Sequence, residues 1–167
     1  MAKQPGRVVI AVGSQAGWVC DLCQTLKIPI QVANTNHAAW CWKNVKRKTD
    51  KDDALKLSQL SAMNQLPVVK LPTRRISQWR SLIAYRHTLI GRRTAVKNNI
   101  RSILDREGLT MPGGRTGWTK QSMAALGLLS RPICPVSGDE LWRGQLHVEL
   151  QALDQTQRLI DPVEQKL

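Results

Sequence analysis

Apolar residues recur at seven-residue steps in the middle of this chain, and this spacing constrains its fold more than any other feature. The repeat consists of Leu82, Leu89, Val96 and Ile103, within a stretch at 76–107 that has no proline and a single glycine. A seven-residue apolar repeat places its members on one stripe of an α-helix, which is buried by packing against another helix. The stretch is therefore predicted to form one long helix of the coiled-coil type.

A second apolar repeat with the same spacing lies near the end of the chain. Leu146, Leu153 and Ile160 form it. Asp139 is expected to cap this helix, and Pro162 is expected to interrupt it. The segment between the repeats provides two loops and a short helix, at 109–117, 131–138 and 118–129. The two repeats are therefore predicted to pack as an antiparallel helical pair.

The N-terminal part of the sequence has the pattern of an α/β domain. Short β-branched runs at 7–12 and 28–33 flank a helical pattern at 15–26. This order predicts a right-handed βαβ unit with parallel strands. The intervening helix is expected to carry Val19, Leu22, Cys23 and Leu26 together on one face. The elements expected next are a helix with His37, Trp40 and Trp42, a helix at 50–65 and an edge strand at 67–72.

Two aspartates open the helix predicted at 50–65. Thr49 and Asp52 have the spacing of a capping box, which leaves Asp50 and Asp53 on one face of the first turn. Two carboxylates aimed at one place suit a hard divalent ion that bridges protein oxygens and phosphates. The alternative is that both acids only complement the positive end of the helix dipole, as acids in a first turn usually do.

Basic residues are concentrated in the first 120 residues, which hold 21 Lys and Arg against 6 Asp and Glu, whereas residues 121–167 hold 4 against 6. Such a one-sided surplus is typical of a protein that binds a polyanion. Nucleic acid is favoured over a membrane, because the sequence has no apolar run of about 18 residues and no signal peptide. The alternative is a solvated charged face. The candidate phosphate contacts are Lys43, Lys46, Arg47, Lys48, Arg80, Arg86, Arg92, Arg93, Lys97 and Arg101.

Cys20 and Cys23 form a CxxC motif, which can indicate zinc binding or thiol redox chemistry. No second CxxC occurs in the sequence, and the motif lies inside a predicted helix. Ordinary buried thiols in a reducing cytosol are therefore expected, which places the protein in the cytoplasm.

Four segments of the chain resemble successive parts of one protein family: GWVCDLC at 17–23, IPIQVANTN at 28–36, WKNVKRKTDKDDA at 42–54 and QWRSLIAYRHTLIGRRTAVKNNIRSIL at 78–104. They are similar to the N-terminal half of the DEDD-type, RuvC-like transposases of the bridge-RNA-guided insertion sequences. The resemblance implies an α/β fold, with a truncated RNase H-like (RuvC-like) domain over 1–72. A long helical, coiled-coil-like extension would follow over 73–167.

The resemblance also implies DNA transposition, with Mg²⁺ held partly by Asp50 and Asp53 as catalytic acids. The implied partners are DNA, a structured guide RNA and a second copy of the chain bound through the helical arm. Of the family's four metal-binding acids, one would lie on a strand before this chain and one near Ala11, and no acid precedes Asp21. The family's serine-bearing domain would lie beyond the end of the chain.

The expectation is therefore a truncated transposase remnant that does not cut DNA by itself. The alternative is a basic RNA- or DNA-binding module, which binds the nucleic acid of its own element or interferes with the full-length transposase.

Overall fold

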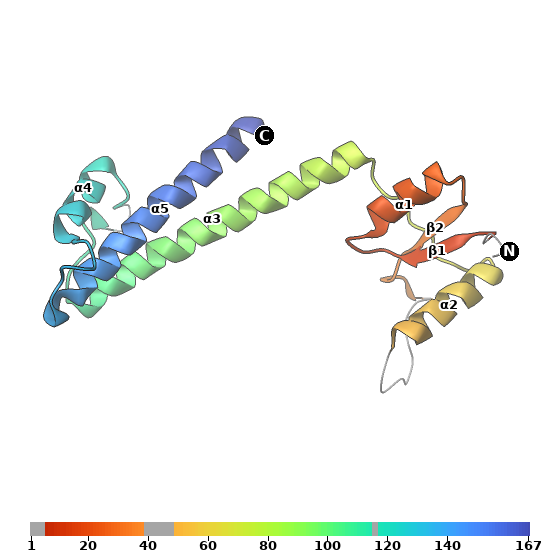
Figure 1. Ribbon diagram of the computed structural model, residues 1–167, viewed down its shortest axis with the longest axis horizontal. Coiled ribbons are helices and arrows are strands. Elements are labelled where there is room, and N and C mark those ends of the chain that lie inside the picture. Colours follow the sequence, from red (N-terminus) through yellow and green to blue (C-terminus); the bar gives the residue numbers. More distant parts are fainter. Residues whose placement is uncertain (1–5, 39–48, 115–116) are drawn as a thin grey trace. The chain divides into compact units, whose positions relative to one another are not determined.

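The computed structural model describes residues 6–38, 49–114 and 117–167. The chain divides into two compact units, Met1–Ser77 and Gln78–Leu167 (Figure 1). The described residues are mostly helical, with a small parallel sheet in the first unit, so the prediction of a mixed α/β protein is confirmed. No helix in these described ranges is long and apolar enough to cross a membrane.

The sheet of the first unit contains β1 (Val8–Ala11) and β2 (Ile30–Ala33), which run parallel. The connecting helix α1 (Ala16–Thr25) completes the βαβ unit predicted from the sequence. The prediction for the buried face of this helix was partly wrong. Cys23 is buried there, but Leu22 and Leu26 are exposed.

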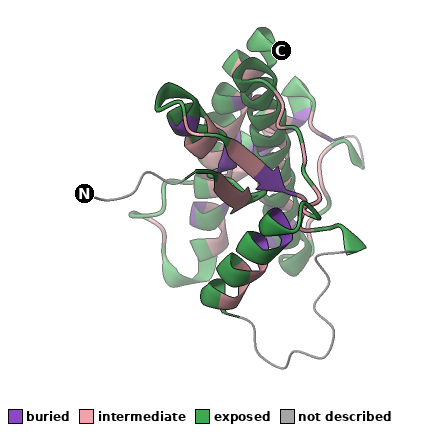
Figure 2. Ribbon diagram, turned by 90° about the vertical axis from the view of Figure 1, so that its right-hand side faces the viewer, coloured by how far each residue is buried: buried purple, intermediate pink, exposed green. Residues whose placement is uncertain are grey.

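Helix α2 (Asp50–Ala62) covers the sheet with its apolar side. Its Leu57 and Leu60 form a small buried cluster with Ala33 of β2 (purple in Figure 2). The backbone N–H of Asn64, just after the helix, donates to the Ser61 carbonyl oxygen, and Asn64 has a positive φ of 55°. These turn contacts end the helix at Ala62, whereas the sequence predicted that it would continue to residue 65.

The edge strand predicted at 67–72 is reduced to one isolated antiparallel bridge between Ala33 and Val68. The backbone N–H of Val69 donates to the Val32 carbonyl oxygen at 2.8 Å. Pro67 and Pro72 bound this segment and have no N–H to donate. Their presence explains why the pairing does not extend into a regular strand.

The second unit is built on two long antiparallel helices, α3 (Arg74–Arg106) and α5 (Leu141–Lys166), with the short helix α4 (Lys120–Leu129) beside them (Figure 1). Most of the predicted repeat positions are buried. The main cluster contains side chains of all three helices: Ile100, Ile103, Leu104, Leu126, Leu146 and Leu153. Leu89 and Ile160 are also fully buried.

Two predictions about α5 were wrong. Asp139 does not cap it, because Asp139 lies in a 3-10 turn at Gly138–Glu140 and α5 begins at Leu141. Pro162 does not interrupt it, because the helix continues to Lys166. Proline removes the hydrogen bond to the carbonyl four residues earlier. Here the turn around Pro162 is kept in place by the buried side chain of Ile160 before it and the ion pair of Glu164 after it.

The loop between α4 and α5 touches α5 at Gly144. A Cβ atom at this position would lie 2.7 Å from Cγ1 and 2.9 Å from Cα of Ile133. Arg143 anchors the same loop, because its Nη1 donates to the Leu129 carbonyl oxygen at 3.2 Å and its carbonyl oxygen accepts from the Arg131 N–H at 3.2 Å. The contact therefore requires a residue without a side chain at 144.

We expect Gly144→Ala to lower the free energy of unfolding by about 1–3 kcal/mol, because the added methyl group overlaps the backbone of Ile133. Gly127→Ala in α4 is the matched control, since its Cβ would meet nothing within 4 Å, and it should raise stability by up to about 1 kcal/mol. Urea denaturation followed by circular dichroism measures both. Equal effects of the two substitutions would contradict the close contact.

Candidate metal centre and nucleic-acid interface

The first turn of α2 contains three aspartates, and one of them serves the helix itself. Thr49 and Asp52 form the predicted capping box: the Thr49 N–H donates to Asp52 Oδ2 at 3.1 Å, and the Asp52 N–H donates to Thr49 Oγ1 at 3.3 Å. Asp50 is exposed and Asp53 is half-buried. The helix therefore presents Asp50 and Asp53 as the two acids outside the cap.

These two acids lie at the carboxyl ends of the parallel strands. Arg7, just before β1, is within hydrogen-bond distance of Ser61 in the last turns of α2, with Nη1 and Oγ 3.5 Å apart. Helix α2 thus runs opposite to β1, and its first turn lies at the end where β1 and β2 finish (Figure 1). In open parallel sheets, ligands bind at this edge.

The number of possible metal ligands at this edge is small. Within the described ranges, no three or more His, Cys, Asp or Glu side chains come close enough together to hold a metal ion. The strands end at Ala11 and Ala33, which bring no donor side chain. The oxygen donors of Asp50 and Asp53 suit Mg²⁺ chemically, but two carboxylates are fewer than the four that the resemblance implies.

The basic residues of α3 fall into groups with different environments. Arg86 and Arg93 face α5: Arg86 Nε donates to Glu164 Oε1 at 3.0 Å, and Arg93 Nη1 donates to Gln157 Oε1 at 2.9 Å. Both partners lie on α5, so the sequence of α3 alone did not indicate them. Both arginines contribute to the pairing of the two helices.

A second group surrounds Trp118, just before α4. Lys97 Nζ lies 4.8 Å from the centroid of the indole ring, and Arg101 Cζ lies 5.4 Å from it. Burial, and then the neighbouring charges of Arg93 and Arg101, lower the pKa of Lys97 below its usual value. Like charges are therefore crowded at this place, and an anion would relieve their repulsion. We call Lys97, Arg101 and Trp118 the Trp118 cluster.

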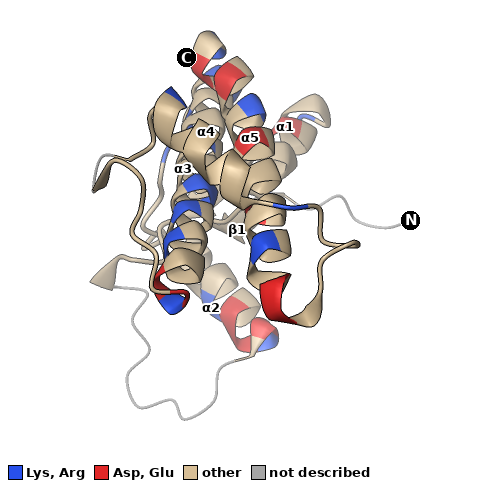
Figure 3. Ribbon diagram, turned by 90° about the vertical axis from the view of Figure 1, so that its left-hand side faces the viewer, with Lys and Arg blue, Asp and Glu red and all other residues tan. Residues whose placement is uncertain are grey.

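A third group is exposed on α3. Arg80 and Arg92 have no hydrogen bond or ion pair with the part of the chain that the structure describes. Figure 3 shows basic residues following one another along α3. The remaining candidates, Lys43, Lys46, Arg47 and Lys48, lie outside the described residues, as do Trp40 and Trp42. Sequence reasoning selected Lys97 and Arg101 for their charge but did not include Trp118, which lies beyond a loop.

The cysteine pair lies inside α1, as predicted. Cys23 is buried and Cys20 is half-buried. Burial, together with the nearby Cys23 and Asp21, raises the pKa of the Cys20 thiol. A raised pKa keeps the thiol protonated, which disfavours both nucleophilic chemistry and metal binding.

Comparison with protein-family models shows that a model for DEDD transposases of the IS110 type, described as Transposase, matches residues 2–108. The matched region runs from before β1 to just after α3, so it includes Asp50, Asp53 and the basic residues of α3. Comparisons with curated proteins and with solved structures gave no match.

Proposed function

The chain belongs to the DEDD transposase family, whose model matches more than half of it, and we propose that it acts in transposition by binding nucleic acid through α3. The Trp118 cluster is the observation that carries this proposal. It combines crowded positive charge with an indole ring, in the part of the second unit where the sequence similarity ends. Arginine and lysine side chains neutralise phosphates, and aromatic rings add stacking surface for bases.

The spacing of the basic residues supports contact with an extended phosphate backbone. Lys97 and Arg101 lie one four-residue step apart, which advances about 6 Å along the helix. An acidic neighbour would raise the pKa of Lys97, whereas the pKa is lowered. We propose DNA and a structured guide RNA as the partners, and the cytoplasm as the compartment in which they meet.

We expect the double variant Lys97→Gln/Arg101→Gln to weaken binding to duplex DNA and to flatten its salt dependence. Each lost phosphate contact reduces the slope of log K against log salt by about 0.9, so two contacts reduce it by about 1.8. Fluorescence anisotropy at several salt concentrations measures this slope.

Arg158→Gln is the control for the salt experiment. Arg158 is exposed on α5 and pairs with Asp154 at 2.8 Å, so its removal deletes a positive charge outside the Trp118 cluster. A slope that changes by the same amount per removed charge in both proteins would show that net charge, and not this cluster, determines binding.

We also propose that the first unit is part of an RNase H-like domain and that Asp50 and Asp53 contribute to a Mg²⁺ site in it. Parallel strands, a crossing helix and two acids at the carboxyl edge of the sheet support this proposal. Bound Mg²⁺ would neutralise negative charge on phosphate oxygens there. Two carboxylates do not provide the ligands of a two-metal site, so we propose that this chain does not cut DNA alone.

The metal proposal predicts that Asp50→Asn/Asp53→Asn abolishes the binding of Mg²⁺ or Mn²⁺ that the unmodified chain shows in calorimetry, because both anionic ligands are lost. Asp21→Asn, an exposed acid in α1, is the control and should bind the metal as before. If the double variant and the unmodified chain bind the metal equally, Asp50 and Asp53 are not its ligands, which would favour the alternative that they complement the helix dipole.

We further propose that the chain self-associates through the N-terminal half of α3. This helix extends past the end of α5, whose last pairing residue is Glu164, opposite Arg86 (Figure 1). Beyond that pair, Trp79 and Ile83 remain 38% and 46% exposed. A second copy would bury these side chains and continue the seven-residue packing of the pair as a coiled coil.

The variant Ile83→Glu should be monomeric in sedimentation equilibrium at concentrations where the unmodified chain is a dimer, because a charge enters the proposed apolar contact. Leu128→Glu is the control, since Leu128 is an even more exposed leucine, at 81%, on α4. A monomeric unmodified chain, or a dimer that Ile83→Glu leaves intact, would contradict this interface.

A further inference from the structure

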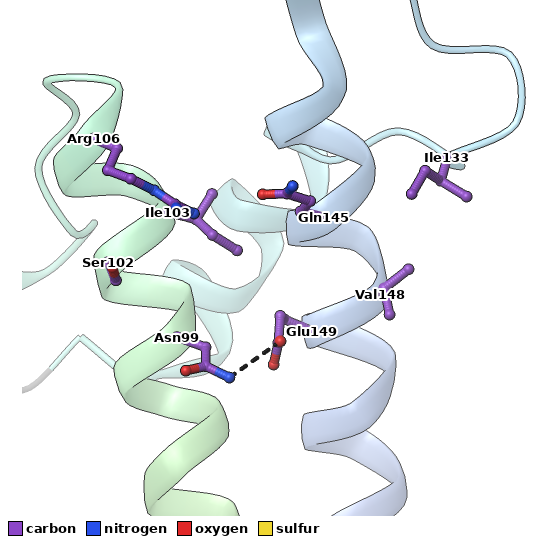
Figure 4. A pocket seen from close by; sticks show the side chains of 8 residues that line it. All are labelled: Asn99, Ser102, Ile103, Arg106, Ile133, Gln145, Val148 and Glu149. Carbon is purple, nitrogen blue, oxygen red and sulfur yellow. Dashed lines mark hydrogen bonds between the residues drawn. The ribbon is translucent and has the colours of Figure 1, made fainter.

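A hollow of about 350 Å³ lies between α3, α5 and the loop before α5 (Figure 4). Its apolar lining consists of Ile103, Ile133 and Val148. The close contact of Ile133 with Gly144 holds this part of the wall in place. The volume lies near the lower end of the range for small-ligand pockets, about 300–1,000 Å³. The hollow therefore has the size to accept one flat ring.

Polar groups line the same hollow. Asn99 Nδ2 of α3 donates to Glu149 Oε1 of α5 at 3.2 Å, and this bond joins the two helices beside the hollow (dashed in Figure 4). The amide has a second N–H and the carboxylate has further lone pairs, so both groups keep capacity for a ligand. Arg106, in the last turn of α3, adds a positive charge to the lining.

Apolar walls with a carboxylate and an amide donor match a nucleobase, which has apolar faces and a polar edge. A carboxylate requires donors, and guanine offers two neighbouring ones, N1–H and N2–H, with the acceptor O6 beside them. We propose that this hollow binds an unpaired guanine, whose two donors contact Glu149 and whose O6 accepts from Asn99. This inference rests on the proposed function, because the guanine belongs to the nucleic acid that α3 binds.

The surrounding charges fit a strand that passes over the hollow. Arg92 and Arg106 are each seven residues from Asn99, which is about 10 Å along the helix and two turns away on the same face. Arg92 is exposed and available for a phosphate. Single-stranded nucleic acid is recognised in this way, by phosphate contacts on either side of a base that is hydrogen-bonded at its edge.

The alternative is that the hydrogen bond between Asn99 and Glu149 only fixes the register of the two helices. Glu149→Gln separates the two roles. The glutamine Oε1 can still accept from Asn99 Nδ2, so the helix pairing is retained. The side chain loses its charge and one of its two acceptor oxygens, so it can no longer accept both guanine donors.

The test uses fluorescein-labelled single-stranded oligouridine RNAs that carry one central guanine, inosine or adenine. Fluorescence anisotropy gives the affinity of the full chain for each. We expect the guanine oligonucleotide to bind about tenfold more tightly than the adenine one, as is typical for a bidentate base contact. Inosine lacks the N2 amino group, so its affinity should lie between the two.

Glu149→Gln should reduce the guanine preference to less than about twofold, with an unchanged melting temperature and unchanged affinity for the adenine oligonucleotide. Val148→Trp gives a second test, because Val148 is 47% exposed and a larger side chain there would fill the hollow. It should also abolish the preference. Asp154→Asn removes one negative charge elsewhere on α5 and should keep it.

The outcomes separate this inference from the proposed function. Binding of all three oligonucleotides without a guanine preference would overturn the guanine site and leave nucleic-acid binding by α3 intact. A preference that both Glu149→Gln and Val148→Trp retain would also overturn the site. No binding of any oligonucleotide at low salt would overturn the guanine site, and the proposed function would also be overturned if the chain then failed to bind duplex DNA.

Discussion

The packing of α5 against α3 is the interaction on which the second unit depends. Fully burying one leucine or isoleucine contributes about 1.5–3 kcal/mol, and Leu104, Leu146 and Ile160 are all fully buried in this unit. The contacts between Arg86 and Glu164 and between Arg93 and Gln157 fix the same antiparallel register. A slip of one helix along the other would leave these apolar and polar groups without their partners. The contacts between α3 and α5 therefore specify a single antiparallel register.

That single register also places the basic residues of α3 in different environments. Arginines close to the seam are used to hold α5, whereas Lys97 and Arg101 lie against Trp118, which the chain brings back after a loop. On another side of α3, the register places Asn99 opposite Glu149 and thereby forms the hollow. One packing solution thus produces both the phosphate-binding surface and the base pocket that we propose.

Local patterns in the sequence predicted much of the fold. By contrast, contacts between residues far apart in the sequence, which depend on the register of α3 and α5, were not predictable. The seven-residue repeats identified Leu89, Leu146 and Leu153 as buried, and the capping box located the start of α2. By contrast, the pairing of Arg86 with Glu164 joins residues 78 positions apart. Trp118 and Ile133 lie in or beside loops without periodicity, so no local signal marked them. Pro162 was misjudged because the rule for proline ignores the tertiary contacts around it.

The first unit depends on a much smaller core than the second. Two strands alone are marginally stable, so the sheet relies on Leu57 and Leu60 of α2 and on the contacts of Arg7 with Ser61 and Gln31. The orientation of Asp50 and Asp53 therefore depends on how α2 is seated on this sheet. The Trp118 cluster belongs to a different unit with its own core. Because sites without shared partners act independently, replacing Asp50 and Asp53 should leave the phosphate binding that we propose for the Trp118 cluster unchanged.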